Sequence, residues 1–203
     1  MKTVILNNGV EIGEKAFANA TTLKSVTLPN TLTVIGKNAF YRCGALTTIN
    51  LSYVTEIYEN AFSGCSALQV VNLSNITKIG ATAFSGCALR ELNLPANIEI
   101  GKDAFLHCSF TKATVSADAI GYMPHSVTEL VVLSGEILSG SLFSYFDDLQ
   151  KLTIGAEVTA ITAGVLPETI NTITVDKNNE QFKVVDGQLI NIETEEVIFD
   201  LND

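Results

Sequence analysis

The dipeptide Ala-Phe recurs along this sequence at a nearly constant interval, and this period constrains the fold more than any other feature. Its phenylalanines are separated by 23, 22, 22 and 21 residues. They are Phe17, Phe40, Phe62, Phe84 and Phe105. Self-similarity at such a period indicates a repeat protein in which each unit is one small structural element. A single unit of this length cannot bury its apolar face, so the units must stack into a continuous core.

A second marker, the pattern L-x-x-[V/I/L]-x-[L/V/I], recurs with the same period. Clear copies begin at Leu23, Leu46, Leu68 and Leu89. Variant copies begin at Phe110, Val127, Leu149 and Ile170, and Met1 stands in the same column at the start. Within each copy the fourth and sixth positions alternate with polar or small neighbours, which is typical of a strand with one buried face. We therefore expect about nine parallel strands lying side by side.

The segment that carries Ala-Phe has a different pattern. In GEKAFANATTL and GKNAFYRCGAL the core residues have spacings compatible with a short helical turn, and a glycine stands at its entrance. Each unit then consists of a strand, a turn, a short extended piece such as TVIG, and a helical turn. The prediction is an α/β solenoid with the strands on its concave face and the helical turns on its convex side.

Two parts of the chain depart from the period. Residues 111–127 have a shortened spacing and no Ala-Phe pair, so we expect an irregular repeat there. Residues 176–203 leave the period, and within them Asp186-Gly187 separates two apolar-rich runs, which is a strong hairpin signal. An antiparallel piece is suited to cover the open end of a solenoid. We predict a solenoid over residues 1–175 and an acidic β-hairpin cap over residues 176–203.

Composition and charge exclude several classes of protein. With 47% apolar and 17% charged residues, the chain is not a generally disordered one. No apolar run approaches the ~20 residues of a membrane helix, and we find no secretory signal, so membrane insertion is not expected. Residues 147–203 carry twelve acidic and three basic side chains, a net charge of −9 against −1 for residues 1–146. Since no basic stripe is available to neutralise phosphates, nucleic acid is not an expected partner.

The cysteines occupy a single column of the repeat. They are Cys43, Cys65, Cys87 and Cys108. Stacked units would place them in a row with parallel directions rather than in a metal-binding tetrad, and there is no C-x-x-C pair. Because free cysteine is among the most buried residue types, we interpret this column and the phenylalanine column as core. We expect no metal and no cofactor.

Three columns of side chains are expected on the exposed side of the strands. One runs Lys24, Thr47, Gln69, Arg90, Thr111, the next Ser25, Thr48, Val70, Glu91, Lys112, and the third Thr27, Asn50, Asn72, Asn93, Thr114. The candidate binding residues among them are Lys24, Thr27, Thr48, Asn50, Gln69, Asn72, Arg90 and Asn93. Concave solenoid faces are common binding surfaces but are not always used, so a face that binds nothing stays open as the alternative.

The repeat unit L-x-x-[V/I]-x-L-P-x-x-[V/L]-x-x-I-G-x-x-A-F-x-x-C resembles the BspA-like leucine-rich repeats of bacteria and protists. It is carried by Leu23, Val26, Leu28, Pro29, Ile35, Gly36, Ala39, Phe40 and Cys43, and by the next two units. The run VVDGQLIN is similar to a non-repeat segment of that family. Ser52, Ser74 and Ser116 depart from the proline column, and Ala113 replaces a large apolar residue. The resemblance implies a right-handed leucine-rich-repeat superhelix, a secreted or cell-surface location in host-associated bacteria, and adhesion.

Two functional hypotheses follow. In the first, the chain is a non-enzymatic binding module that uses its concave face for a protein or glycan on host or neighbouring cells. In the second, it is a structural spacer or stalk of a larger surface protein, a reading favoured by the start of the chain within a repeat unit. An enzyme is not expected, because no acid-base constellation occurs outside the acidic terminal segment.

Overall fold

The computed structural model describes residues 2–144 and 146–203, and Met1, predicted in the leucine column, lies outside them. The chain forms two compact units, Met1–Phe110 and Thr111–Asp203, which are described separately. The division into solenoid and cap after residue 175 stays a prediction. Among the described residues, none of the helices has the length and apolarity needed to cross a bilayer.

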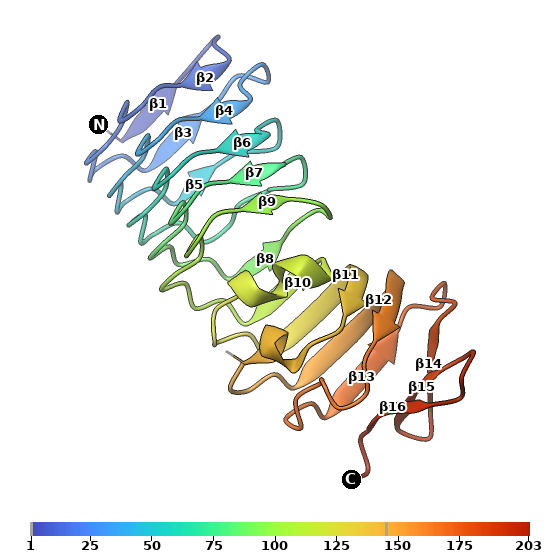
Figure 1. Cartoon of the computed structure of the whole chain (residues 1–203). Helices are drawn as coiled ribbons and strands as arrows, with labels where there is room; N and C mark the ends of the chain where they lie inside the picture. Colours follow the sequence, from blue (N-terminus) through green and yellow to red (C-terminus); the bar gives the residue numbers. More distant parts are fainter. Residues whose placement is uncertain (1, 145) are drawn as a thin grey trace. The chain divides into compact units, whose positions relative to one another are not determined.

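The first unit is a stack of coils held together by two rows of parallel strands (Figure 1). The first row is a three-stranded sheet of β1 (Thr3–Ile5), β3 (Ser25–Thr27) and β5 (Thr48–Ile49), paired in that order; β8 (Glu91–Asn93) has the same position in its repeat but does not pair within this sheet. The second row is a five-stranded sheet of β2 (Glu11–Ile12), β4 (Val34–Ile35), β6 (Glu56–Ile57), β7 (Lys78–Ile79) and β9 (Glu99–Ile100). The parallel solenoid predicted from the period is confirmed. The sequence pattern does not predict that the short extended pieces pair with one another to form a second sheet.

The strand predicted from Leu68 is reduced to one bridge. Thr48 pairs with Val70, and no strand is formed over residues 68–73. The backbone of this coil still contacts the next one, because the N–H of Arg90 donates to the carbonyl of Gln69 at 3.1 Å. The predicted row of strands is therefore interrupted at its fourth copy.

The segments around the phenylalanines are hydrogen-bonded turns rather than the predicted helical turns. Alternate N–H groups point to the next coil, as when Phe40 donates to the carbonyl of Ala61 at 2.7 Å and Arg42 to that of Ser63 at 2.8 Å. The N–H groups between them close short turns, such as that from Tyr41 to the carbonyl of Asn38 at 3.1 Å. An α-helix requires successive N–H groups to point the same way along its axis, so this alternation excludes it.

Left-handed residues produce this alternation. One lies two positions before each repeat phenylalanine and another lies two positions after it. The first set is Lys15, Asn38, Asn60, Thr82 and Asp103, and the second is Asn19, Arg42, Gly64, Gly86 and His107. A residue with positive φ reverses the helical course of the chain, and Asn, Asp and Gly are the residues that adopt it most readily. The α/β class is therefore corrected for this unit to a solenoid of strands and turns.

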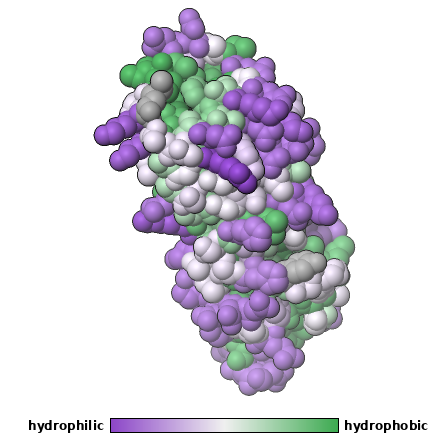
Figure 2. Space-filling model, turned by 90° about the vertical axis from the view of Figure 1, so that its left-hand side faces the viewer, coloured by the Kyte–Doolittle hydropathy of each residue, from purple (hydrophilic) through white to green (hydrophobic). Residues whose placement is uncertain are grey.

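The core of the first unit is a ladder of phenylalanine rings. Neighbouring rings lie 5.2 to 5.8 Å apart between centroids and within 9° of parallel. Phe40, Phe62, Phe84 and Phe105 are at most 1% exposed. Phe17, expected in the same buried column, is only half-buried, because it stacks on Phe40 alone. Hydrophobic residues gather near this end of the unit in Figure 2.

Threonines and a glycine fix the close approach of successive coils. The hydroxyls of Thr55 and Thr77 donate to the carbonyls of Thr33 and Thr55 in the preceding coils, at 3.3 and 3.0 Å. In the Ile-Gly step, a Cβ added to Gly36 would lie 2.6 Å from the carbonyl oxygen of Ile12. Glycine is therefore required at this position because any side chain would collide with the backbone of the preceding coil. The backbone dihedral angles of this residue do not themselves require glycine.

The second unit contains a parallel sheet of longer strands. It is built from β10 (Lys112–Val115), β11 (Glu129–Ile137), β12 (Lys151–Ile161) and β13 (Thr172–Val175). Two short 3₁₀ helices, η1 (Ala117–Tyr122) and η2 (Gly140–Phe143), lie between them. Helix η1 occupies the irregular repeat predicted over residues 111–127.

The unit ends in an antiparallel sheet of β14 (Phe182–Val185), β15 (Gln188–Asn191) and β16 (Val197–Asp200). Asp186 and Gly187 have φ of 50° and 84°, so the Asp-Gly hairpin is present with both central residues left-handed. The buried side chain of Asn179 joins this sheet to β12. Its amide nitrogen donates to the carbonyls of Gly155 at 2.7 Å and Val158 at 3.0 Å, and its oxygen accepts the N–H groups of residues 181 and 182.

Candidate functional site

The exposed side of the first strand row carries the candidate binding residues, and we call it the first-sheet face. Thr27, Thr48 and Asn93 lie in β3, β5 and β8, whereas the other five candidates flank these strands or the bridge at Val70. All eight are exposed: Lys24, Thr27, Thr48, Asn50, Gln69, Asn72, Arg90 and Asn93. The alternate positions, such as Val26, Ile49 and Leu92, are buried, since a strand directs successive side chains to opposite sides. The structure thus exposes all eight candidates, which lie in consecutive coils.

Asn50 and Asn72 also support the backbone. The side-chain oxygen of each accepts the N–H of the serine two residues on, at 3.0 Å in both cases. Asn72 additionally donates to the hydroxyl of Ser52 at 3.1 Å, which links two coils. An Asx turn of this kind turns the chain after β5 and after the bridge at Val70, toward the second sheet. These two amides are therefore partly structural, and only their remaining hydrogen-bonding capacity faces solvent.

Lys24, Gln69 and Arg90 form the part of this face with free side chains. Within residues 2–144 and 146–203, neither cation forms an ion pair. Val70, in the column beside them, is 63% exposed. The face therefore presents the hydrogen-bond donors of Lys24 and Arg90, the side-chain amide of Gln69 and the apolar side chain of Val70. Such groups support non-covalent binding and provide no nucleophile or acid-base pair.

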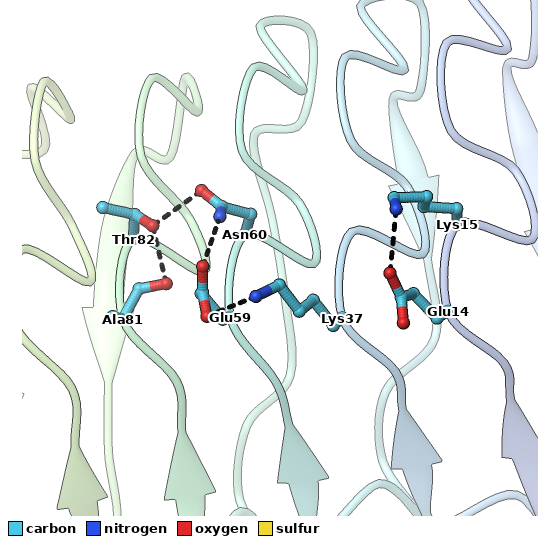
Figure 3. A network of polar contacts seen from close by, with 7 residues as sticks. All are labelled: Glu14, Lys15, Lys37, Glu59, Asn60, Ala81 and Thr82. Carbon is cyan, nitrogen blue, oxygen red and sulfur yellow. Dashed lines mark hydrogen bonds and ion pairs between the residues drawn. The ribbon is translucent and has the colours of Figure 1, made fainter.

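Several charged residues on the turns and the second sheet are paired, in contrast. Lys37 forms an ion pair with Glu59 of the next coil at 2.8 Å, and Asn60 donates to Glu59 at 3.2 Å (Figure 3). Thr82 continues the network by donating to Asn60 at 2.7 Å. On the second sheet, Lys78 pairs with Glu99 at 3.1 Å. These exposed contacts neutralise charge between coils, so this side is less suited to recognise a charged ligand.

The sheet of the second unit also neutralises its own charges. Glu129 lies between Lys112 and Lys151, with distances of 2.9 and 3.2 Å. Hydrogen bonds from these two lysines lower the pKa of Glu129 and keep it ionised. Next to them, the hydroxyls of Thr153 and Thr174 are 2.8 Å apart. The candidate site therefore consists of the first-sheet face of the first unit.

The cysteine column belongs to the core. Each thiol donates to the carbonyl of a phenylalanine in the preceding coil, as from Cys43 to Phe17 at 3.0 Å and from Cys65 to Phe40 at 3.2 Å. Burial raises the pKa of Cys65 to about 12 and that of Cys108 to about 11. A reactive thiol requires a lowered pKa, so these groups are unsuited to nucleophilic chemistry. In the described part of the chain, no three His, Cys, Asp or Glu side chains converge on a common metal position.

Sequence reasoning missed the structural role of Asn50 and Asn72. The signal was present, because a serine stands two residues after each of them, as an Asx turn favours. It also missed the pairing of charges across the turns. Lys37 and Glu59 are one repeat apart, and their proximity becomes visible only once the register of the coils is known.

Known proteins share the repeat pattern and the fold of this chain. Six copies of the BspA type leucine rich repeat region match residues 1–112. A leucine rich cell surface protein from Faecalibacterium prausnitzii is 25% identical with a TM-score of 0.55, and the match covers 96% of this chain and 52% of that one. This chain therefore spans about half the length of that relative.

Two further structures share the fold. The leucine rich repeat protein of T. pallidum is 23% identical with a TM-score of 0.53, covering 85% of this chain and 72% of that one. A leucine-rich repeat protein from Bacteroides ovatus is 19% identical with a TM-score of 0.50, and the corresponding coverages are 88% and 73%. No curated protein matches the sequence.

Proposed function

The chain belongs to the family of BspA-type leucine-rich repeat proteins, and from this premise we propose that it is a non-enzymatic binding module at the cell surface or in the extracellular space. The relative from Faecalibacterium prausnitzii is described as a cell surface protein, which supports this location. The proposed partner is a protein or glycan on host or neighbouring cells, and the proposed role is adhesion.

The observation that carries the proposal is the difference between the first-sheet face and its surroundings. Lys24, Gln69 and Arg90 are exposed and form no side-chain hydrogen bond or ion pair within the described ranges, whereas Lys37 of the turns and Lys78 of the second sheet are paired. Neighbouring parallel strands lie ~4.8 Å apart, so these side chains form a regularly spaced array. An extended partner surface can contact this array over several coils. A rigid scaffold avoids the cost of ordering the backbone on binding, although each immobilised long side chain costs about 0.5–1.5 kcal/mol.

The test removes these side chains without changing the strands. In the variant K24T/Q69T/R90T each residue is replaced by threonine, which stands naturally in the same column at Thr47. The protein and the variant are compared on a glycan array and on cultured epithelial cells, with bound protein measured by fluorescence. We expect the variant to lose at least about tenfold in apparent affinity, as for the loss of two or more contacts at the centre of an interface.

The matched control removes the same number of positive charges, two, from a different part of the surface. In the variant K37S/K102S two exposed lysines of the turns are replaced, and binding is expected to stay within about twofold of the original because neither residue belongs to the first-sheet face. Equal binding by the original protein and K24T/Q69T/R90T, with both folded, would remove the first-sheet face from consideration.

The second candidate is a spacer in a longer surface protein, with recognition elsewhere. It is favoured by the Faecalibacterium relative, of whose length this chain covers 52%. A spacer predicts that the chain alone binds neither the array nor the cells at micromolar concentration. Specific binding by the chain alone would contradict it.

A further inference from the structure

The C-terminal antiparallel sheet has an apolar side that faces solvent, here called the outward face. In the register of β14, β15 and β16, Lys183 lies opposite Ile190, which lies opposite Val197. Val185 follows two residues along β14 on the same side, and Ile192, two residues after Ile190, comes directly after the end of β15. Val185, Ile192 and Val197 are 42 to 43% exposed. Four aliphatic side chains are therefore grouped on a small outward face.

The opposite side of the same sheet accounts for its folding. Phe182, Leu189 and Ile198 are at most 4% exposed. The bulge between Leu189 and Ile190 in the pairing with β16 leaves Ile198 on this buried side. This side thus supplies the fully buried residues of the sheet. The exposed parts of the apolar residues on the outward face are available for contact with another molecule.

Six carboxylates lie in the turns, in β16 and after β16, and are here called the rim. They are Asp186, Glu193, Glu195, Glu196, Asp200 and Asp203. Over residues 182–203 the only basic side chain is Lys183, and no ion pair is formed within this described stretch. Gln188 donates to Asp200 at 2.7 Å, and this hydrogen bond, with those from Asn202, lowers the pKa of Asp200. The rim is therefore negatively charged at neutral pH.

The negative charge of the rim favours one class of binding partner for the outward face over the others. A second copy of the chain would bring two rims of like charge together around a small apolar contact, and such juxtaposition is costly. Anionic surfaces are repelled for the same reason. A polypeptide in which apolar residues alternate with lysine or arginine matches both features, because its apolar side chains meet Val185, Ile190 and Val197 while its cations meet the rim.

The sheet also offers a place for an extended chain. Strand β16 pairs with β15 and with no other strand in the described residues, so one of its edges keeps free backbone groups. A segment added at such an edge directs every second side chain to the same side as Val197. We propose that the outward face and the edge of β16 bind a basic extended segment of a partner protein. This surface is separate from the first-sheet face and does not depend on the function proposed for it.

The experiment uses the full chain and a fluorescent peptide of alternating lysine and valine, with binding followed by anisotropy. Peptides of alternating lysine and serine, and of alternating glutamate and valine, are the matched controls for the apolar and charged parts. We expect saturable binding of the lysine-valine peptide and at least about tenfold weaker binding of both controls, since each lacks half of the complementarity. Raising the salt from about 0.15 M to about 1 M should weaken binding severalfold through screening.

Two variants test the surface from the side of the protein. V185T/I192T/V197T keeps β-branched residues in the sheet but removes its apolar contact, and binding should fall at least about tenfold. The control V10T/V70T removes two apolar side chains that are 66% and 63% exposed elsewhere and should leave binding unchanged.

The second variant, E193Q/E195Q/E196Q, removes three charges of the rim and should weaken binding and reduce its salt dependence. Hydrogen exchange of the β15 amides checks that the sheet remains folded in both variants. The K24T/Q69T/R90T variant should bind the peptide normally, so that failure here is distinguishable from failure of the proposed adhesion. The proposal is overturned if the lysine-valine peptide does not bind at millimolar concentration, if the folded variants bind it as the original does, or if sedimentation shows copies associating through this face.

Discussion

Removal of one ring from the phenylalanine ladder should cost far more in its middle than at its first position. Phe62 is fully buried and stacks on Phe40 and Phe84, with centroids 5.2 Å away on both sides. Phe17 is half-buried and stacks only on Phe40. Replacing a buried phenylalanine by alanine typically costs about 3–5 kcal/mol, and each ring pair contributes about 0.5–1.5 kcal/mol.

From these values Phe62→Ala should lower the free energy of unfolding by about 4 kcal/mol, and Phe17→Ala by about half as much, because the Phe17 side chain is already partly exposed and has only one ring neighbour in the ladder. The measurement is equilibrium urea denaturation followed by circular dichroism, with hydrogen exchange of the turn amides to locate the loss. In a stack of repeats each unit contacts only its neighbours, so exchange should increase most in the coils that flank residue 62.

The conservative variant Phe62→Leu serves as a control. Leucine keeps most of the apolar volume but loses the ring contacts, so a loss of about 1–2 kcal/mol is expected. Equal losses for Phe17→Ala and Phe62→Ala would refute the reasoning, since they would mean that stacking from both sides does not set the stability of the ladder.

Three further predictions concern single buried contacts. The Cys65 thiol, with a pKa of about 12 against 9.0 for an exposed group, should resist alkylation at pH 8 until the protein unfolds, and stability should fall as pH rises from about 9 to about 12 because the unfolded thiol ionises first. Gly36→Ala should destabilise the stack by about 2–4 kcal/mol through contact with the carbonyl of Ile12, whereas Gly13→Ala, with open space around its Cβ, should be tolerated; equal thermal shifts would contradict this. Asn179→Ala should cost about 3 kcal/mol in denaturant unfolding because buried carbonyl and N–H groups lose their partners, and an unchanged midpoint would show that water replaces them.

Much of the first unit was accessible from the sequence because repetition reveals it. The columns of Phe62 and Cys65 recur in phase, and alternation around Ile49 assigns one side of its strand to the core. These patterns depend on local chain geometry and on the need to bury apolar surface. The Asp186-Gly187 hairpin was predictable for the same reason, since its turn chemistry is local.

The helical turns were predicted wrongly because apolar spacing does not report the sign of φ. Ala39, Phe40 and Cys43 fit a helical spacing, but Asn38 and Arg42 have φ of 56° and 57°. Arginine has no intrinsic preference for this region. It is held there because the N–H of Arg42 bonds to the next coil, a partner that exists only after the coils have stacked.

The sequence by itself determined that the chain repeats, which residues face the core, and which residues stand in the exposed columns. Only the tertiary structure decided that the turns are not helical, that Lys37 is neutralised by Glu59 while Lys24 and Arg90 remain free, and that Asn72 is partly occupied by Ser52. The reason is physical. Periodicity records what one coil must bury, whereas the pairing of polar groups depends on the register between coils, and that register is fixed by contacts among residues about one repeat apart.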